Sequence, residues 1–125
     1  MNQYAKPSII YIMIPVSQPF LKIGKSTKEI QALHRDHMQS FGSNMCLIFF
    51  QMILTDSQLN ELEMKIHYTL HQLSYSHIGR ELYKMEFYGK CKEIIGNMCS
   101  MMCNRQIIPI KYVHNINDMD WEPTC

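Results

Sequence analysis

The sequence predicts a small α+β domain in which helices cover one central, mostly antiparallel sheet. Three observations predict this class: β-branched apolar runs of strand length, helical repeats between them, and capping or turn residues where they meet. The chain has 125 residues, 46% hydrophobic and 18% charged, which fits one folded domain. The expected order is β-β-α-β-α-β-α, with a further strand near the C-terminus.

The N-terminal half predicts a β-hairpin, a helix and a buried strand. Residues 8–14 are rich in Ile and end at Pro15, and residues 20–24 alternate between two sets of side chains, so the two runs are expected to pair. Ser26 or Thr27 is expected to cap a helix that continues to about Ser40. Residues 45–54 are almost wholly apolar, which favours an interior strand.

The C-terminal half predicts a longer helix, a short strand, another helix and an edge strand. Thr55 begins the first helix, which extends to about Leu73, and residues 81–85 and 89–102 form the next strand and helix. Residues 107–113 suit an edge strand, because Pro109 has no N–H to donate. The domain is therefore expected to span 1–113, followed by an acidic tail over 114–125. The longer helix should bury the stripe Leu59, Leu62, Ile66 and Leu70.

Composition points to a protein inside the cell, in the cytoplasm or nucleus. The longest apolar run is far shorter than the roughly 20 residues of a membrane-spanning helix, and the first residues do not form a secretory signal. Five cysteines, an odd number, favour free thiols or metal ligands over a disulfide framework. The net charge of +1 argues against a strong non-specific nucleic-acid binder but permits a local basic patch. Eleven Met, with many Ile, Lys and Asn, are typical of AT-rich coding sequences such as those of large DNA viruses.

Four short motifs resemble those of the GIY-YIG endonuclease superfamily, in the branch common in phages and large DNA viruses. Their order and separations fit the family, and together they cover about residues 9 to 95. The motifs are Ile9-Ile10-Tyr11, Lys22-Ile23-Gly24 with Lys25-Ser26 after it, Glu63-Met64-Lys65-Ile66-His67, and Arg80-Glu81-Leu82-Tyr83.

The resemblance implies roles for five side chains in cutting a phosphodiester bond. Tyr11 would help to activate water, Arg35 would steady the phosphate, and Glu81 would hold a divalent metal, Mg²⁺ or Mn²⁺. Lys22 would replace the second tyrosine of the family, as a phosphate contact or a proton acceptor. His67 would relay a proton or orient the nucleophile. Positive charge for binding DNA would come from Lys25, Lys28, Arg80 and Lys84.

The chain departs from the family pattern at three positions. Ile9 stands where the first tripeptide has glycine, and Lys22 where the second has tyrosine. Arg35 follows Gly24 by eleven positions, later than in the family, so His34 is the alternative occupant of the arginine's place.

Two functions are therefore expected to compete. The first is a metal-dependent, endonuclease-like phosphodiesterase acting on DNA. The alternative is a catalytically inactive module of the same type that binds nucleic acid or a host protein. Oligomeric state is left open by the sequence.

A zinc site is a third and weaker hypothesis. Two pairs of possible ligands each lie one helical turn apart and together could form a Cys₂His₂ site, although the cysteines also suit a helix core. The four residues are His67, His71, Cys99 and Cys103.

Overall fold

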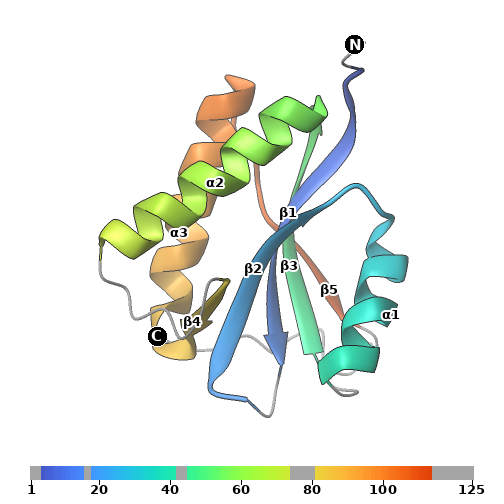
Figure 1. Ribbon diagram of the computed structural model, residues 1–125, viewed down its shortest axis with the longest axis vertical. Coiled ribbons are helices and arrows are strands. Elements are labelled where there is room, and N and C mark those ends of the chain that lie inside the picture. Colours follow the sequence, from blue (N-terminus) through green and yellow to red (C-terminus); the bar gives the residue numbers. More distant parts are fainter. Residues whose placement is uncertain (1–3, 16–17, 42–44, 74–80, 114–125) are drawn as a thin grey trace.

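The computed structural model is an α+β domain built on one five-stranded antiparallel sheet, as predicted (Figure 1). It describes residues 4–15, 18–41, 45–73 and 81–113. The strand order is β4-β2-β1-β3-β5, and every neighbouring pair is antiparallel. The elements are, along the chain, β1 (Lys6–Pro15), β2 (Phe20–Ser26), α1 (Ile30–Phe41), β3 (Met45–Leu54), α2 (Asp56–Gln72), β4 (Leu82–Lys84), the 3₁₀ turn η1 (Met85–Phe87), α3 (Tyr88–Cys103) and β5 (Ile110–Val113).

Strand β1 lies at the centre of the sheet, between β2 and β3. It pairs with β3 along its whole length, from Lys6 opposite Leu54 to Pro15 opposite Met45. Its pairing with β2 is the predicted hairpin. Because side chains alternate between the two faces of a strand, this register decides which residues of β1 and β2 share a face.

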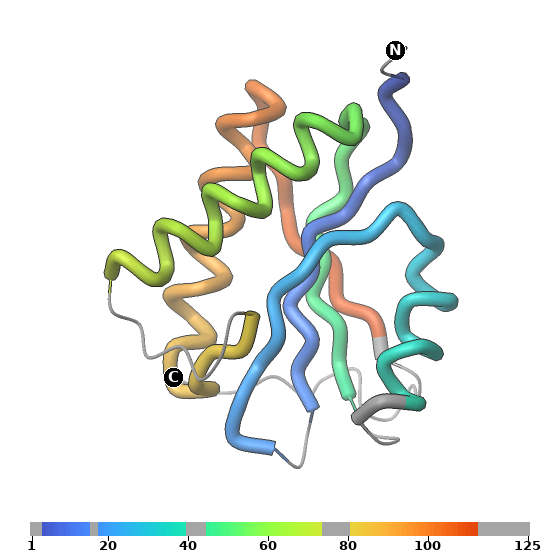
Figure 2. The backbone as a smooth tube through the Cα atoms, in the orientation of Figure 1, coloured from blue at the N-terminus to red at the C-terminus, as the bar shows by residue number. Residues whose placement is uncertain are grey.

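The two faces of the sheet carry separate apolar clusters. Helices α2 and α3 cover one face and α1 covers the other, as the backbone tube in Figure 2 shows. On the α2–α3 face, Ile12 and Phe50 are fully buried beneath the predicted stripe of α2. On the α1 face, Tyr11, Met13 and Leu47 pack against Leu33 of α1. A sheet buried on both sides explains why the strands are apolar runs rather than alternating ones.

The starts of α1 and β5 differ most from those predicted. Helix α1 begins at Ile30, because β2 continues to Ser26 and the Ser26 hydroxyl accepts a hydrogen bond from the Lys28 N–H, at 2.9 Å, in a turn before the helix. Strand β5 begins at Ile110, directly after Pro109, and so later than the predicted start at 107; it forms an edge of the sheet, as predicted, and pairs with β3. The tail predicted over 114–125 lies outside the described residues.

Within the ranges that the structure describes, none of the helices is long and apolar enough to cross a membrane.

Helix α2 starts at a capping box. The Thr55 hydroxyl accepts from the Gln58 N–H at 3.2 Å, and the Gln58 side chain accepts from the Thr55 N–H at 2.9 Å. These two bonds satisfy backbone donors that the helix itself leaves without acceptors. The cap therefore fixes where α2 starts. It thereby also fixes the positions of the side chains further along the helix.

Replacing the capping hydroxyl should lower stability. Thr55→Ala is expected to reduce the free energy of unfolding by about 1 kcal/mol in urea denaturation followed by circular dichroism. Ser57→Ala, one residue inside the same exposed first turn, is the control and should change it by less than about 0.5 kcal/mol. Equal losses in the two variants would contradict the capping role.

Candidate active site

The ring of Tyr11 lies across Gly24 on the neighbouring strand. The two residues are cross-strand partners, and a Cβ added at Gly24 would come within 2.5 Å of the Tyr11 Oη and 2.8 Å of its Cζ. Only glycine leaves room for a ring in this position. The Tyr11 hydroxyl therefore lies above β2, on the face of the sheet that α1 covers.

His37 of α1 holds the Tyr11 hydroxyl. Its Nδ1 is 2.9 Å from the Leu33 carbonyl oxygen, and its Nε2 is 3.1 Å from the Tyr11 Oη. A carbonyl only accepts, so Nδ1 carries the proton, and Nε2 of a neutral ring then accepts from the tyrosine O–H. Burial lowers the pKa of His37, which favours this neutral form at pH 7.

Two carboxylates act on the same hydroxyl. Burial raises the pKa of Tyr11 well above its usual value, and the charges of Glu81 and Glu63 raise it further. Glu81 precedes β4, and its carbonyl oxygen accepts from the Ile23 N–H of β2 at 3.0 Å. Its side-chain Oε2 lies 4.0 Å from the Lys22 Nζ, across the edge between the two strands. The backbone bond thus fixes Glu81 at the edge of β2.

Glu63 of α2 reaches the same edge from the other face of the sheet. Its Oε1 is 3.2 Å from the Lys25 Nζ, and its Oε2 is 3.9 Å from the His67 Nε2, which is longer than a hydrogen bond. The His67 ring and the Lys25 ammonium lower the pKa of Glu63, and Lys25 is the closer of the two. Glu63 is therefore ionised at neutral pH.

A second tyrosine–histidine pair, Tyr83 and His67, lies beside Glu63. The His67 Nδ1 is 2.6 Å from the Tyr83 Oη, and the two rings are stacked with an interplanar angle of 9°. Tyr83 of β4 is fully buried, and burial raises the pKa of its hydroxyl. Tyr83 thus fixes the orientation of the His67 ring, whose Nε2 makes no hydrogen bond within the described part of the chain.

A surface pocket of about 410 Å³ opens beside these groups. It is formed by one side of α2 and by the residue that leads into β4. Its lining is Glu63, Met64, His67, Tyr68, His71 and Glu81. The pocket therefore combines two carboxylates and two imidazoles with two large side chains that are mostly exposed.

Four of the five predicted catalytic residues gather at this edge. Tyr11 and Lys22 come from the hairpin, His67 from α2 and Glu81 from the start of β4. Arg35 does not join them. It is exposed on α1, two positions before His37, and two residues turn a helix by about 200°.

His34 does not join these residues either. It is buried, with its Nε2 3.4 Å from the Met45 carbonyl oxygen and its ring edge-on to Tyr112. The residue of α1 that faces Tyr11 is His37. The motif resemblance did not point to His37, because its contact with Tyr11 depends on how α1 packs against β1.

The predicted DNA-binding side chains are largely engaged with carboxylates. Lys25 contacts Glu63, and Lys28 Nζ is 2.5 Å from the Asp36 Oδ2. Lys84 is exposed on β4. Arg80 lies outside the described residues.

The zinc hypothesis is wrong. Among the described residues, which include all four proposed ligands, no group of three or more His, Cys, Asp or Glu is placed to hold a metal ion. Cys99 is fully buried in the core, and burial raises the pKa of its thiol to about 12, so the thiolate that zinc requires is disfavoured. His67 bonds to Tyr83 instead.

A magnesium ion makes a different demand from zinc. Mg²⁺ keeps several of its waters and is commonly bound through one or two carboxylates together with substrate phosphate. Glu81 suits that mode, because its side chain is 44% exposed and borders the pocket.

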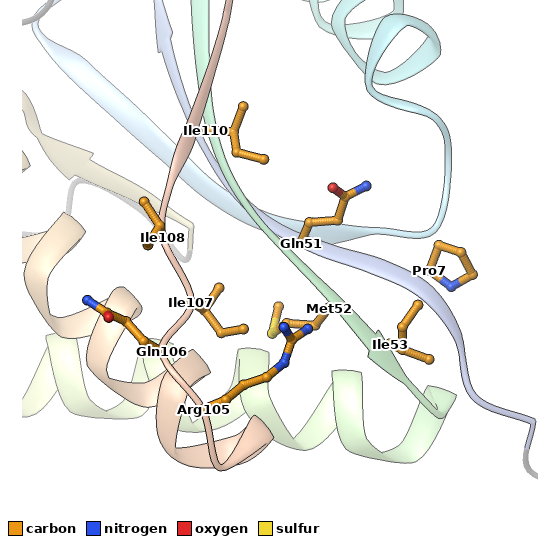
Figure 3. Close-up of a pocket in the computed structure, with 9 residues that line it drawn as sticks. All are labelled: Pro7, Gln51, Met52, Ile53, Arg105, Gln106, Ile107, Ile108 and Ile110. Carbon is orange, nitrogen blue, oxygen red and sulfur yellow. The ribbon is translucent and has the colours of Figure 1, made fainter.

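A larger cavity, of about 520 Å³, lies away from this edge (Figure 3). It is lined by Pro7 of β1, the end of β3 and the segment that leads into β5, and Arg105 is its one charged side chain among the described residues. Most of the other side chains in Figure 3 are aliphatic. The lining therefore offers no acid–base pair, and the candidate active site is the smaller pocket together with the Tyr11–His37 pair.

Comparison of the chain with protein-family models, with curated proteins and with solved structures finds no match.

The crossing of Tyr11 over Gly24 can be tested by adding one methyl group. Gly24→Ala should reduce the free energy of unfolding by about 1–3 kcal/mol, because the new Cβ overlaps the buried ring. Gly96→Ala is the control, because its Cβ would lie 3.4 Å from Phe50, at ordinary contact, and alanine favours a helix. Adding Tyr11→Leu to Gly24→Ala should restore part of the loss, whereas additive losses would contradict the overlap.

The buried, neutral His37 predicts a dependence of stability on pH. Its pKa is lower in the folded protein than the usual value near 6.5, so below that value the unfolded chain binds more protons. The free energy of unfolding should therefore fall as the pH drops from 7 to 5. The slope should be smaller in His37→Asn, measured by urea titration at each pH, and equal slopes would contradict this protonation state.

Proposed function

We propose that this chain is a metal-dependent, endonuclease-like phosphodiesterase of the GIY-YIG type that acts on DNA. The proposal rests on one observation: the Tyr11–His37 pair, Lys22 and Glu81 lie close together at one edge of the sheet. Hydrolysis of a phosphodiester needs a base for water, positive charge at the phosphate and support for the leaving oxygen. Each of these needs has a candidate group within the cluster.

The Tyr11–His37 pair supplies the base. The raised pKa of Tyr11 strongly disfavours its ionised form. Tyr11 would therefore act as a neutral hydroxyl, which accepts a proton from water while it donates its own proton to His37. As water attacks phosphorus, its proton passes to the Tyr11 oxygen, and the Tyr11 proton passes to His37 Nε2. The new P–O bond forms on the water oxygen, and the bond to the leaving oxygen breaks.

Lys22 supplies positive charge at the phosphate. Its alkyl chain leaves β2 on the face that carries Tyr11, and its ammonium group is half-buried beside Glu81. In this position it can contact a non-bridging phosphate oxygen and give a proton to the leaving oxygen. This contact would take over the role that the resemblance gives to Arg35, which lies on the exposed side of α1.

Glu81 is the residue that would hold the divalent ion, Mg²⁺ or Mn²⁺. The ion would supply neutralisation of charge on the phosphate when bound. Glu81 contributes a carboxylate whose position is set by the backbone bond to Ile23, so its side chain borders the pocket whether or not Lys22 remains beside it.

A second candidate function is a binding module that has lost cleavage. The observation that favours it is the neutralisation of Lys25 by Glu63 and of Lys28 by Asp36, which reduces the positive charge available to a DNA backbone. Such a module would bind nucleic acid weakly or a host protein. Under either function we place the protein inside the cell, where buried cysteine thiols such as those of Cys46 and Cys91 stay reduced.

Cleavage of DNA should depend on Glu81. Supercoiled, single-stranded and branched DNA are each incubated with Mg²⁺ or Mn²⁺, and Glu81→Gln is expected to lower the cleavage rate about 100-fold or more, because the carboxylate that holds the ion is lost. Glu86→Gln, at an exposed glutamate of η1, is the matched control and should cut at the wild-type rate. DNA binding without cutting, in every metal and by well-folded protein, would favour the binding module instead.

A further inference from the structure

The pocket beside Glu81 has a composition that a phosphate backbone does not explain. Two of its walls are the carboxylates of Glu63 and Glu81, which repel phosphate unless a metal ion lies between them and it. Two others are the side chains of Met64 and Tyr68, each 67% exposed, which is unusual for large apolar groups on one helix face. A pocket that repels anions and offers an aromatic face suits a neutral, planar ligand with hydrogen-bond donors.

We propose that this pocket binds one unpaired nucleobase of the DNA, next to the phosphate at Glu81, and that guanine is the preferred base. The inference rests on the proposed function, since it places the base beside the site of cleavage. It makes the substrate a strand with at least one base out of the duplex: a single strand, a branch or a frayed end.

The carboxylates that line the pocket determine which edge of a base can form hydrogen bonds there. A carboxylate offers only acceptors, about four lone-pair positions on two oxygens, and one lysine contact leaves others available. Guanine presents two adjacent N–H donors on its Watson–Crick edge, which match a carboxylate in two parallel hydrogen bonds. Thymine presents one N–H between two carbonyl groups, which face a carboxylate unfavourably.

The state of Glu63 supports this edge recognition. His67 and Lys25 keep its carboxylate ionised, and the Lys25 ammonium group contacts Oε1 at 3.2 Å. The His67 Nε2, 3.9 Å from Oε2, is buried, so the carboxylate rather than the imidazole is left to recognise the base edge.

Tyr68 supplies the stacking surface. It lies one residue after His67 on α2, and its ring is on the lining of the pocket. An unpaired base stacked on an aromatic side chain gains binding that does not depend on sequence, while the hydrogen bonds decide which base is preferred. A paired base offers neither its face nor its Watson–Crick edge, so duplex DNA is excluded from the pocket.

Binding is measured by fluorescence anisotropy with labelled strands in EDTA, so that no cutting occurs. The probes are an all-thymine strand, the same strand with one central guanine, and that strand annealed to its complement. Wild type should bind the guanine strand about tenfold more tightly than the all-thymine strand, the discrimination expected from paired hydrogen bonds to the guanine edge. It should bind the duplex more weakly than either strand.

The variants separate stacking from edge recognition. Tyr68→Ala should weaken binding of the guanine strand about tenfold, and Tyr68→Phe should retain it. Glu63→Gln should reduce the preference for guanine over thymine, whereas Glu61→Gln, on the same helix but salt-bridged to Lys65, should leave it unchanged.

Three results would overturn the proposal: equal binding of the two strands, binding of the duplex as tight as that of the guanine strand, or no effect of Tyr68→Ala. Adding Mg²⁺ to the same probes distinguishes this failure from that of the proposed function. Cutting without regard to guanine would sustain the phosphodiesterase and reject the base pocket. Guanine-dependent binding without cutting in any metal would sustain the pocket and reject the phosphodiesterase.

Discussion

The candidate site depends on the passage of one aromatic ring over one glycine. Tyr11 is buried on the central strand, where its hydroxyl would ordinarily need a partner on its own face of the sheet. Because Gly24 has no side chain, the ring crosses β2, and His37 of α1 satisfies the hydroxyl there. The hairpin register and the docking of α1 are thus tied together at a single hydrogen bond.

The same edge of β2 joins the two faces of the sheet. Strand β4 has only three residues and pairs with Phe20, Leu21 and Lys22. Beyond that pairing and the Glu81 bond to Ile23, β2 runs on to Ser26 with no strand of the described chain on its outer side. Side chains from α1 and from α2 therefore approach the same stretch from opposite faces. This geometry explains how the charges of Glu63 and Glu81 reach a tyrosine that packs under α1.

The fold was predictable from the sequence because its strands and helices are locally consistent. The apolar run that became β3 and the stripe Leu59, Leu62, Ile66 and Leu70 were predicted as the structure has them, since each depends on periodicity alone. The start of α1 was predicted too early, because Ser26 can cap a helix or end a strand, and pairing with Ile9 favoured the strand.

The site was predictable only in part. Motif resemblance pointed to Tyr11, Lys22, His67 and Glu81, which the structure brings to one edge. It gave no indication of His37, whose contact with Tyr11 spans 26 residues of sequence and depends on how α1 packs on the sheet. The hydrogen bond between His67 and Tyr83 could not be predicted for the same reason. Contacts between distant elements depend on tertiary packing, which local sequence patterns do not predict.

The charge balance of the site sets how a substrate can be held. Lys22, Lys25 and Lys28 each lie beside a carboxylate, so the edge of β2 carries almost no net positive field. Association with DNA by phosphate contacts alone would then be weak and easily lost in salt. Under the proposed function, affinity would come instead from groups whose contribution salt does not screen, such as stacking on an exposed ring and hydrogen bonds to a base edge.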